Sequence, residues 1–436
     1  MNQIANKKTL RAAQRVSIEG GVRLHGEVTL GAAKNSILRL MVATLLTSER
    51  CIIGPFPDQM LDVLTLQDML AALGKRISRQ GGEIQIEEDS HVTELKWPGR
   101  SIRSTILIAS TLLARFGRAV VPNPGGCAIG DESGGERKID LHLMIFEKMG
   151  ATWREEGDLL IVEAPGRLKG AEIFLPIRST GATESGILAG VLAHGETTIW
   201  GPHVRPEILD LIAMLRTMGA TIDVYGQERI VVQGCESLRG TTYRCISDNV
   251  EAISWAVAAA VTGGDIEIRN FPIQDLEIPL IFLRESGVRM FVDGNDLIVR
   301  HSNCQPIDIS TGPYPGINSD MQPLFAVLGL FARGESRIVD LRFRGRYQYA
   351  AQFEKMGGDI SIDGNMLRII GGKPLNGTEV VATDLRAGIG LLIAGLGANG
   401  TTTLSEAWQV ERGYDRVWEK VNALGGMVRV SEYANI

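Results

Sequence analysis

Residues 208–219 read ILDLIAMLRTMG, with apolar residues at i, i+3 and i+4 spacing and a closing Met-Gly pair. This pattern predicts an amphipathic helix that ends at a glycine, the residue that most readily adopts the left-handed conformation found at helix ends. Equivalent closing pairs recur along the chain at Leu73-Gly74, Met149-Gly150, Met218-Gly219, Ser286-Gly287, Met356-Gly357 and Leu424-Gly425. Because successive closing glycines lie 68 to 76 residues apart, we interpret the chain as six copies of one supersecondary unit.

Each unit begins with a segment that is apolar on nearly every face, such as residues 104–117 (STILIASTLLARFG) and 388–400 (GIGLLIAGLGANG). A helix of this composition must be buried on nearly all sides. A short β-rich segment, the amphipathic helix and a hairpin-like pair then follow, so the sequence predicts an α/β protein. We expect two domains of three units each, at residues 31–246 and at residues 1–30 plus 247–436. The alternative is a solenoid that only binds partners, but solenoid repeats are usually shorter and simpler.

The composition is that of a globular protein, with 44% apolar and 22% charged residues among 436. A net charge of −6 argues against nucleic acid as a partner, since proteins that bind phosphate backbones usually carry a basic excess. Five widely spaced cysteines without a C-x-x-C pair indicate a reducing compartment and exclude the usual zinc spacings. The sequence has neither a signal peptide pattern nor an 18-residue apolar run, so we expect a cytoplasmic protein without a membrane partner.

Charged residues mark the entrances of the predicted helices. Lys34, Arg103 and Arg386 precede buried helices, where an unpaired cation is costly, and we interpret them as anion ligands. Other entrances carry the expected N-cap residues, namely Ser179, Asp248, Asp320 and Asp384. The amphipathic helices begin near Arg137, Arg346 and Arg412, at 11 to 13 residues before the closing glycine. Because arginine opposes the helix dipole there, its recurrence favours recognition of phosphate or carboxylate.

The second unit contains an unusual loop within residues 122–143, PNPGGCAIGDESGGERKIDLHL. A lone cysteine is most often a small buried apolar residue. Cys127, however, is flanked by glycines and polar residues and is followed by Arg137 and Lys138, an environment that exposes a thiol and lowers its pKa. The loop lacks the G-x-x-x-x-G-K-[ST] pattern of a P-loop, and the sequence contains no His/Cys/carboxylate cluster typical of a metal site.

Taken together, these segments resemble the enolpyruvyl transferase family over essentially the whole chain from about Val16. The resemblance rests on segments that follow one another in order: GAAKNSILRLMVATLL, IRSTILIASTLLARFG, GGCAIG, RKIDLHL, TGATES, RPEILDL, NSDMQP, RFRGRY, ATDLRAG and ERGYDR. It implies a two-domain inside-out α/β barrel built from six βαβαββ repeats, with the site between the domains. It implies no metal or organic cofactor.

The resemblance also implies a reaction, in which the enolpyruvyl group of phosphoenolpyruvate moves to a hydroxyl of a uridine nucleotide and phosphate leaves. By resemblance, Lys34, Arg137, Arg386 and Arg412 bind phosphoenolpyruvate, Cys127 is the acid and Asp320 takes the acceptor proton, so that Cys127, Asp320, Lys34 and Arg412 are the catalytic residues. The implied acceptor contacts are Asn35, Arg103, Asp140, Ser179, Glu207, Ser319, Phe343 and Arg346.

The sequence departs from the family pattern on the acceptor side. Ile177 stands where the family commonly has Lys, Asn249 stands where it commonly has Arg, and the loop between Gly130 and Arg137 is longer than usual. Arg178 is a candidate substitute for one lost cation. We therefore keep three alternatives: the 3-OH of UDP-N-acetylglucosamine as acceptor, the ribose 3-OH of UMP in nucleoside-antibiotic synthesis, and a non-catalytic regulator that binds a phosphorylated ligand.

Overall fold

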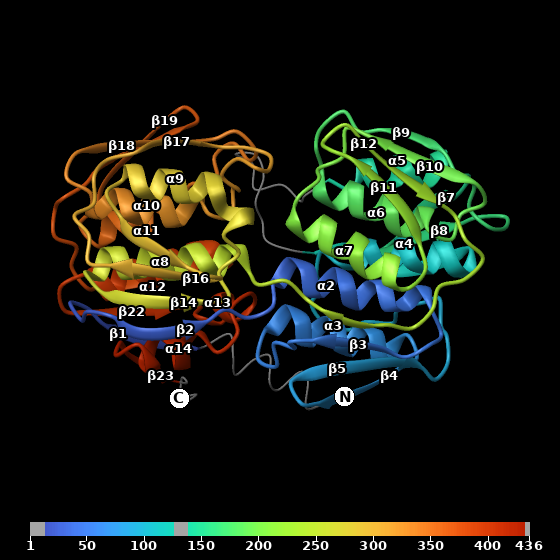
Figure 1. Ribbon diagram of the computed structural model, residues 1–436, viewed down its shortest axis with the longest axis horizontal. Helices are drawn as coiled ribbons and strands as arrows, with labels where there is room; N and C mark the ends of the chain where they lie inside the picture. The colour runs from blue at the N-terminus through green and yellow to red at the C-terminus, as the bar shows by residue number, and fades with distance from the viewer. Residues whose placement is uncertain (1–13, 126–137, 432–436) are drawn as a thin grey trace.

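The computed structural model describes residues 14–125 and 138–431. They form a mixed α/β protein with two bodies side by side (Figure 1), each with its own hydrophobic core. The first core draws its side chains from residues 32–245. The second core draws them from residues 16–30 and 250–428. The α/β class predicted from the sequence is confirmed.

Within the described residues the strands form six separate sheets, five of four strands and one of three, and none closes on itself. In spatial order the sheets of the first core are β13 (Thr242–Arg244), β3 (Cys51–Gly54), β5 (Glu83–Glu88), β4 (Lys75–Gln80); β6 (Arg118–Pro122), β8 (Leu159–Glu163), β7 (Thr152–Glu156); and β9 (Glu172–Phe174), β10 (Glu196–Trp200), β12 (Arg229–Gln233), β11 (Thr221–Tyr225). Those of the second core are β2 (His25–Thr29), β14 (Asp265–Arg269), β16 (Asp296–Arg300), β15 (Arg289–Asp293); β17 (Asp308–Thr311), β18 (Glu335–Asp340), β20 (Met366–Ile370), β19 (Asp359–Asp363); and β21 (Glu379–Val381), β22 (Thr401–Ser405), β1 (Arg15–Glu19), β23 (Met427–Ser431).

The helices alternate between a buried and an amphipathic kind, as the sequence predicts. The buried helices are α2 (Lys34–Ala43), α4 (Thr105–Phe116), α6 (Thr180–Gly190), α8 (Asn249–Thr262), α10 (Gln322–Phe331) and α12 (Leu385–Gly397). The amphipathic helices are α3 (Leu61–Ala72), α5 (Asp140–Lys148), α7 (Pro206–Thr217), α9 (Glu277–Glu285), α11 (Ala350–Lys355), α13 (Trp408–Glu411) and α14 (Val417–Ala423), and the 3₁₀ turns are η1 (Thr44–Leu46) and η2 (Gln274–Leu276). Helices α8, α10 and α12 pack together in the second core, and α4 contacts both α2 and α6 in the first.

The four-stranded sheets share one pairing pattern. A short strand runs parallel to the strand that follows a buried helix, and two antiparallel strands complete the sheet, as in β9, β10, β12 and β11. In the three-stranded sheet, a parallel bridge from Glu94 to Val120 takes the place of the short strand. This recurrence agrees with the repeated unit inferred from the closing glycines, all six of which have positive φ values, between 81° and 105°.

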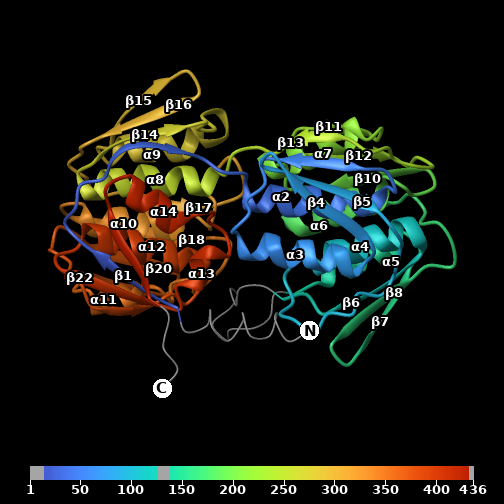
Figure 2. The same cartoon turned by 90° about the horizontal axis from the view of Figure 1, so that it is seen from below.

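Two strands are exchanged between the bodies. Strand β2 leads into α2 of the first core but pairs with β14, while β13 leads into α8 of the second core but pairs with β3. The chain therefore crosses between the cores twice, and the two crossings lie side by side because Ala32 and Ser247 form an antiparallel bridge. In Figure 1 the blue strands β1 and β2 lie within the yellow and red body, and Figure 2 shows β1 there from below. The crossings fix the two bodies against each other beside the starts of α2 and α8.

Among the described residues, none of the helices combines the length and apolarity needed to cross a membrane.

Candidate active site

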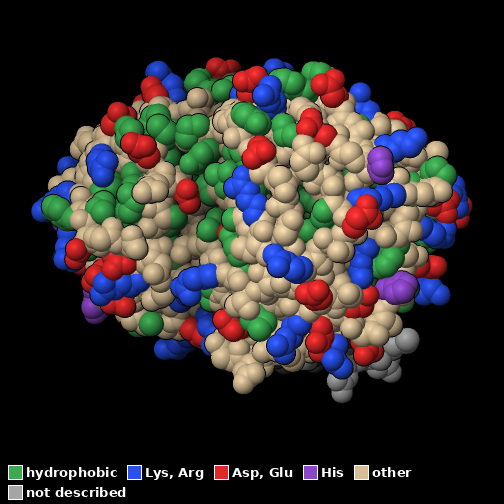
Figure 3. All heavy atoms as spheres, turned by 45° about the vertical axis from the view of Figure 1, so that its right-hand side comes forward, with side chains coloured by type: hydrophobic (Ala, Val, Ile, Leu, Met, Phe, Trp, Pro, Cys, Tyr) green, Lys and Arg blue, Asp and Glu red, His purple; other side chains and the backbone are tan. Residues whose placement is uncertain are grey.

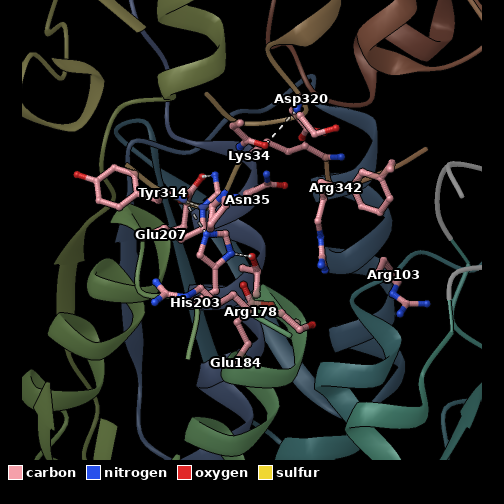
Figure 4. Close-up of a pocket in the computed structure, with 18 of the residues that line it drawn as sticks. Lys34, Asn35, Arg103, Arg178, Glu184, His203, Glu207, Tyr314, Asp320 and Arg342 are labelled. Carbon is pink, nitrogen blue, oxygen red and sulfur yellow. Dashed lines mark hydrogen bonds and ion pairs between the residues drawn. The ribbon is translucent and has the colours of Figure 1, made fainter. Parts of the chain in front are cut away.

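A cavity of about 810 Å³ is lined by residues from both bodies. The six buried helices all begin at this cavity, because its lining includes a residue at each entrance: Lys34, Ser104, Thr180, Asn249, Met321 and Leu385. The first turn of a helix has free N–H groups and the positive end of the helix dipole, so a cavity surrounded by helix starts favours anions. Figure 4 looks into this cavity.

The cavity contains all the described residues that the sequence predicts for the site. These are Lys34, Asn35, Arg103, Asp140, Ser179, Glu207, Ser319, Asp320, Phe343, Arg346, Arg386 and Arg412. Two further predicted residues, Cys127 and Arg137, lie outside the described residues. Ile177 and Asn249, the two departures from the family pattern, also line the cavity.

A first cluster of charges surrounds Asp62, in the first turn of α3. Lys34 Nζ lies 2.8 Å from Asp62 Oδ2, and Arg412 Nε lies 3.1 Å from Asp62 Oδ1. All three residues are buried. Burial raises the pKa of the Asp62 carboxyl, but the charges of Lys34 and Arg412 outweigh this effect and bring the pKa down to about 2. Asp62 therefore remains a carboxylate and holds two cations together across the boundary between the bodies.

A second cluster surrounds Asp320, which precedes α10. Its Oδ1 lies 2.9 Å from Arg346 Nη2, and its Oδ2 lies 3.3 Å from Arg386 Nη2. The prediction that Asp320 caps this helix is wrong: the N-cap residue of α10 is Met321, and no side-chain cap bond is formed. The carboxylate turns instead toward the two guanidinium groups, a stronger interaction than one hydrogen bond to a backbone N–H. Burial raises the pKa of Asp320, but Arg386 and Arg346 hold it well below its usual range.

Arg386 is fully surrounded by the second core, at 3% exposure. Its Nη1 donates to the hydroxyl of Tyr414 at 3.3 Å, and that hydroxyl lies 2.8 Å from Ser254 Oγ. The Nε atom of Arg386 is buried and has no hydrogen-bond partner within the described part of the chain. Since a buried donor without an acceptor is costly, this N–H is suited to an oxygen of an anionic ligand.

Arg346 is held in place by a network below the cavity. Its Nη1 donates to Ser319 Oγ at 2.9 Å, and Ser319 Oγ donates to the buried Asp340 carboxylate at 2.5 Å. Asp340 also accepts a hydrogen bond from Thr311 Oγ1 at 2.8 Å. Because each member of this network is satisfied, the Arg346 guanidinium has a fixed direction toward the cavity.

A third group lies at the start of α7. Arg205 and Glu207 form a double contact, with Nε to Oε2 at 2.6 Å and Nη2 to Oε1 at 2.7 Å. Next to it, His203 Nε2 accepts from the backbone N–H of Tyr314 at 3.0 Å, and His203 Nδ1 lies 2.9 Å from Thr180 Oγ1. The accepting Nε2 carries no proton, so the ring is neutral and donates from Nδ1. Burial, together with the charges of Arg205 and Arg342, lowers the pKa of His203 to about 4.

The remaining predicted residues line the cavity without forming a charge cluster. Arg103 donates to the backbone oxygen of Lys138 at 2.7 Å. Ser179 is the N-cap of α6, as predicted, and its Oγ accepts from the N–H of Ala182. Asp248 and Asp384 cap α8 and α12, also as predicted. The starts of the buried helices therefore carry both N-cap side chains and the cations described above.

Several residues of the cavity were not predicted from the sequence: Asp62, Arg205, His203 and Arg342. For Asp62 a signal existed, because it stands 12 residues before its closing glycine, as Glu207 does, and so within the range that contains the recurring arginines. His203 and Arg342 lie in irregular loops, where no periodicity marks them.

Among residues 14–125 and 138–431, no group of three or more His, Cys, Asp or Glu side chains is arranged to hold a metal ion.

The geometry defines a class of protein before any relative is considered: an α/β protein whose two bodies enclose a cation-rich cavity suited to small anionic ligands. Comparison with known proteins specifies the family. Residues 18–421 match the family described as EPSP synthase (3-phosphoshikimate 1-carboxyvinyltransferase). The chain is 38% identical over 422 residues to UDP-N-acetylglucosamine 1-carboxyvinyltransferase of Zymomonas mobilis, covering 94% of this chain and 98% of the relative. It is 40% identical over 427 residues to the enzyme of the same name from Gluconobacter oxydans, covering 96% and 100%.

Solved structures agree. The enolpyruvyl transferase NikO from Streptomyces tendae superimposes with a TM-score of 0.85 at 26% identity, over 96% of this chain and 99% of that one. EPSP synthase from Acinetobacter baumannii, at 21% identity and a TM-score of 0.73 over 96% and 100% of the two chains, shares the fold. The chain belongs to the EPSP synthase family of 1-carboxyvinyltransferases, and the resemblance predicted from its sequence is confirmed.

Proposed function

We propose that this protein transfers the enolpyruvyl group of phosphoenolpyruvate to a hydroxyl of a uridine nucleotide, with the 3-OH of UDP-N-acetylglucosamine as the first candidate. Relatives near 40% identity over almost their whole length carry that acceptor in their names. The observation that carries the proposal is the pair of cation clusters on Asp62 and Asp320 in one cavity. Phosphoenolpyruvate has a phosphate and a carboxylate, and Lys34, Arg412 and Arg386 of these clusters are cations suited to such groups.

The proposed reaction is an addition followed by an elimination. A proton adds to the methylene carbon, the acceptor oxygen forms a bond to the adjacent carbon, and the acceptor hydroxyl loses its proton. The bond between that carbon and the phosphate oxygen then breaks, a proton leaves the methyl carbon, and phosphate is released. We assign Lys34, Arg386, Arg412 and Arg137 to phosphoenolpyruvate, Cys127 to the first proton and Asp320 to the acceptor proton, as the family resemblance implies.

The environment of Asp320 supports its role as the base. Two arginines hold its pKa far below that of a useful base, although the group is ionised and able to accept a proton. An anionic substrate competes with Asp320 for the guanidinium of Arg386, whose buried Nε still lacks an acceptor. Substrate binding therefore raises the basicity of Asp320 at the moment when the acceptor hydroxyl arrives.

The acceptor side comprises Asn35, Arg103, Asp140, Ser179, Glu207, Ser319, Phe343 and Arg346 in this proposal. A simpler nucleotide such as UMP, accepting at its ribose 3-OH, is the second candidate. It is favoured by Ile177, an uncharged cavity residue that is 52% exposed.

We further propose the finer architecture that the family resemblance implies: six βαβαββ units in two inside-out α/β barrels, divided at residues 30/31 and 246/247. The shared pairing pattern of the sheets and the two separate cores support it. Small-molecule substrates and a cytoplasmic location follow from the proposed reaction.

The test is release of inorganic phosphate from phosphoenolpyruvate in the presence of UDP-N-acetylglucosamine, UMP or uridine, with the mass of the acceptor product measured in parallel. The proposal expects phosphate release coupled to an acceptor that has gained one enolpyruvyl group. Binding of phosphoenolpyruvate without release by any acceptor would favour the non-catalytic regulator instead.

A further inference from the structure

The cavity is far more positive than the rest of the molecule. Among residues 14–125 and 138–431, ten basic and six acidic side chains line it, although the whole chain has a net charge of −6. On the outer face shown in Figure 3, basic and acidic side chains are interspersed instead. Since excess like charge inside a cavity is unfavourable without a counter-charge, this excess points to anionic ligands.

Six of the ten cations already share four carboxylates. Lys34 and Arg412 contact Asp62, Arg346 and Arg386 contact Asp320, Arg39 contacts Glu184, and Arg205 contacts Glu207. The clusters on Asp62 and Asp320 contain the described residues that we assign to phosphoenolpyruvate. Arg178 and Arg342 belong to neither cluster, and they are candidates for the second substrate together with Arg346, which we assign to the acceptor side.

Arg342 is the clearest of these. Within the described ranges its guanidinium forms neither a hydrogen bond nor an ion pair; it lies 5.4 Å from the ring of Phe343 and is attracted by the charge of Asp340. Its side chain is accessible to solvent and lines the cavity. In Figure 4 it extends from the side of the cavity that carries Asp320 toward the side that carries Arg178 and His203.

Arg178 lies on the facing wall, just before α6, and its Nη1 donates to Gln227 Oε1 at 2.9 Å. The charges of Arg178 and Arg342 both lower the pKa of the His203 ring, so both guanidinium groups lie near this histidine. His203 is neutral and uses both ring nitrogens in hydrogen bonds. A neutral ring leaves the charge of both cations uncompensated.

We propose that Arg342, opposite Arg178, binds a phosphate group of the nucleotide acceptor and so compensates for the cations absent at positions 177 and 249. The inference rests on the proposed function. It assigns acceptor selectivity to a residue of the loop after β18, in the second body, whereas Ile177 and Arg178 belong to the first body. A phosphate held between them contacts both bodies. Arg342 does not increase the affinity for a nucleoside that lacks a phosphate.

The test compares Arg342→Met with Arg344→Met, a matched control on the same loop that is exposed and outside the cavity lining. Calorimetric titrations with UMP, UDP-N-acetylglucosamine, uridine and phosphoenolpyruvate measure binding without requiring turnover. We expect Arg342→Met to weaken the phosphorylated acceptors at least tenfold, as typical for one charge-assisted hydrogen bond, and to leave uridine and phosphoenolpyruvate unchanged. Arg344→Met should bind like the original protein, and Arg342→Lys should recover part of the loss.

The titrations with UMP and with UDP-N-acetylglucosamine show which acceptor places its phosphate on Arg342. It is the nucleotide whose affinity falls more in Arg342→Met. An equal loss for uridine and UMP, a loss confined to phosphoenolpyruvate, or no loss overturns the inference. An original protein that binds neither nucleotide overturns it as well. Failure of the proposed function has a different signature: the titrations show nucleotide binding that depends on Arg342, but no acceptor supports phosphate release.

Discussion

Arg412 and Asp62 are 350 residues apart in the sequence, yet Arg412 Nε donates to Asp62 Oδ1 at 3.1 Å. The contact joins the turn between α13 and α14 of the second body to the first turn of α3 in the first body. Lys34 Nζ shares the same carboxylate at 2.8 Å. Asp62 thus stands between two cations that we assign to phosphoenolpyruvate, and it keeps them together before the substrate arrives.

Replacement of Asp62 by Asn should destabilise the empty protein and increase the stabilisation provided by phosphoenolpyruvate. Without the carboxylate, Lys34 and Arg412 are buried like charges, and breaking a buried pair typically costs about 3–5 kcal/mol. The substrate then restores the missing negative charge. Thermal unfolding with and without phosphoenolpyruvate measures both effects.

The matched control for this prediction is Asp58→Asn. Asp58 also contacts an arginine of the other body, Arg416, at 2.7 Å, but both side chains are more than 40% exposed. An exposed pair contributes at most about 1 kcal/mol, so this variant should unfold close to the original temperature. Equal effects of the two substitutions would contradict the role of burial.

Replacement of Asp320 by Asn should abolish most of the turnover while phosphoenolpyruvate still binds. Loss of a general base typically costs about 10²- to 10⁴-fold in rate. At the same time Arg346 and Arg386 lose their shared carboxylate and become available to the substrate. The measurements are kcat for phosphate release and a titration with phosphoenolpyruvate. A variant with normal kcat would exclude Asp320 as the base.

The fold was more predictable than the site. Six closing glycines and six apolar segments determine where helices end and which helices are buried, because both signals are local. The expected domain bounds place β2 and β13 in the bodies where they pair, but their partners β14 and β3 have no local signal, since short strands pair with whichever sheet edge the topology brings near. For the site, cations at helix entrances could be recognised as surplus to folding. The carboxylates that pair with these cations could not be recognised. Asp62, for example, looks in the sequence like any acidic residue in the first turn of a helix.

His203 predicts a dependence of stability on pH. Its pKa is about 4 in the folded protein, because of burial and the charges of Arg205 and Arg342, against an ordinary value of 6.5. The unfolded chain therefore binds more protons between these values, so stability should fall as the pH decreases from about 6.5 to about 4. The hydrogen bond from Tyr314, in the other body, should be lost on protonation, since Nε2 can then no longer accept.

The pH prediction is checked by unfolding temperatures from pH 7.5 to 4 for the original protein and for His203→Asn. The variant should be less stable at pH 7.5, by about 1–2 kcal/mol for the lost hydrogen bonds, and should lose less on acidification. His301→Asn serves as the control, because His301 is exposed and lies outside the cavity lining. Identical pH profiles for the three proteins would exclude His203 as the titrating group.

Substitutions at two closing glycines of the first body allow the cost of backbone strain to be measured apart from the cost of steric crowding. Gly74 and Gly150 have nearly equal φ values, 90° and 92°, so alanine is strained at both by about 1–2 kcal/mol. A Cβ added at Gly74 would lie 2.3 Å from the Ser90 carbonyl oxygen, whereas one at Gly150 would meet nothing within 4 Å. Gly74→Ala should therefore lower the unfolding temperature clearly more than Gly150→Ala, because the backbone at Ser90 must also move. Equal losses would mean that the conformation alone requires glycine at these helix ends, and that the packing around them contributes nothing.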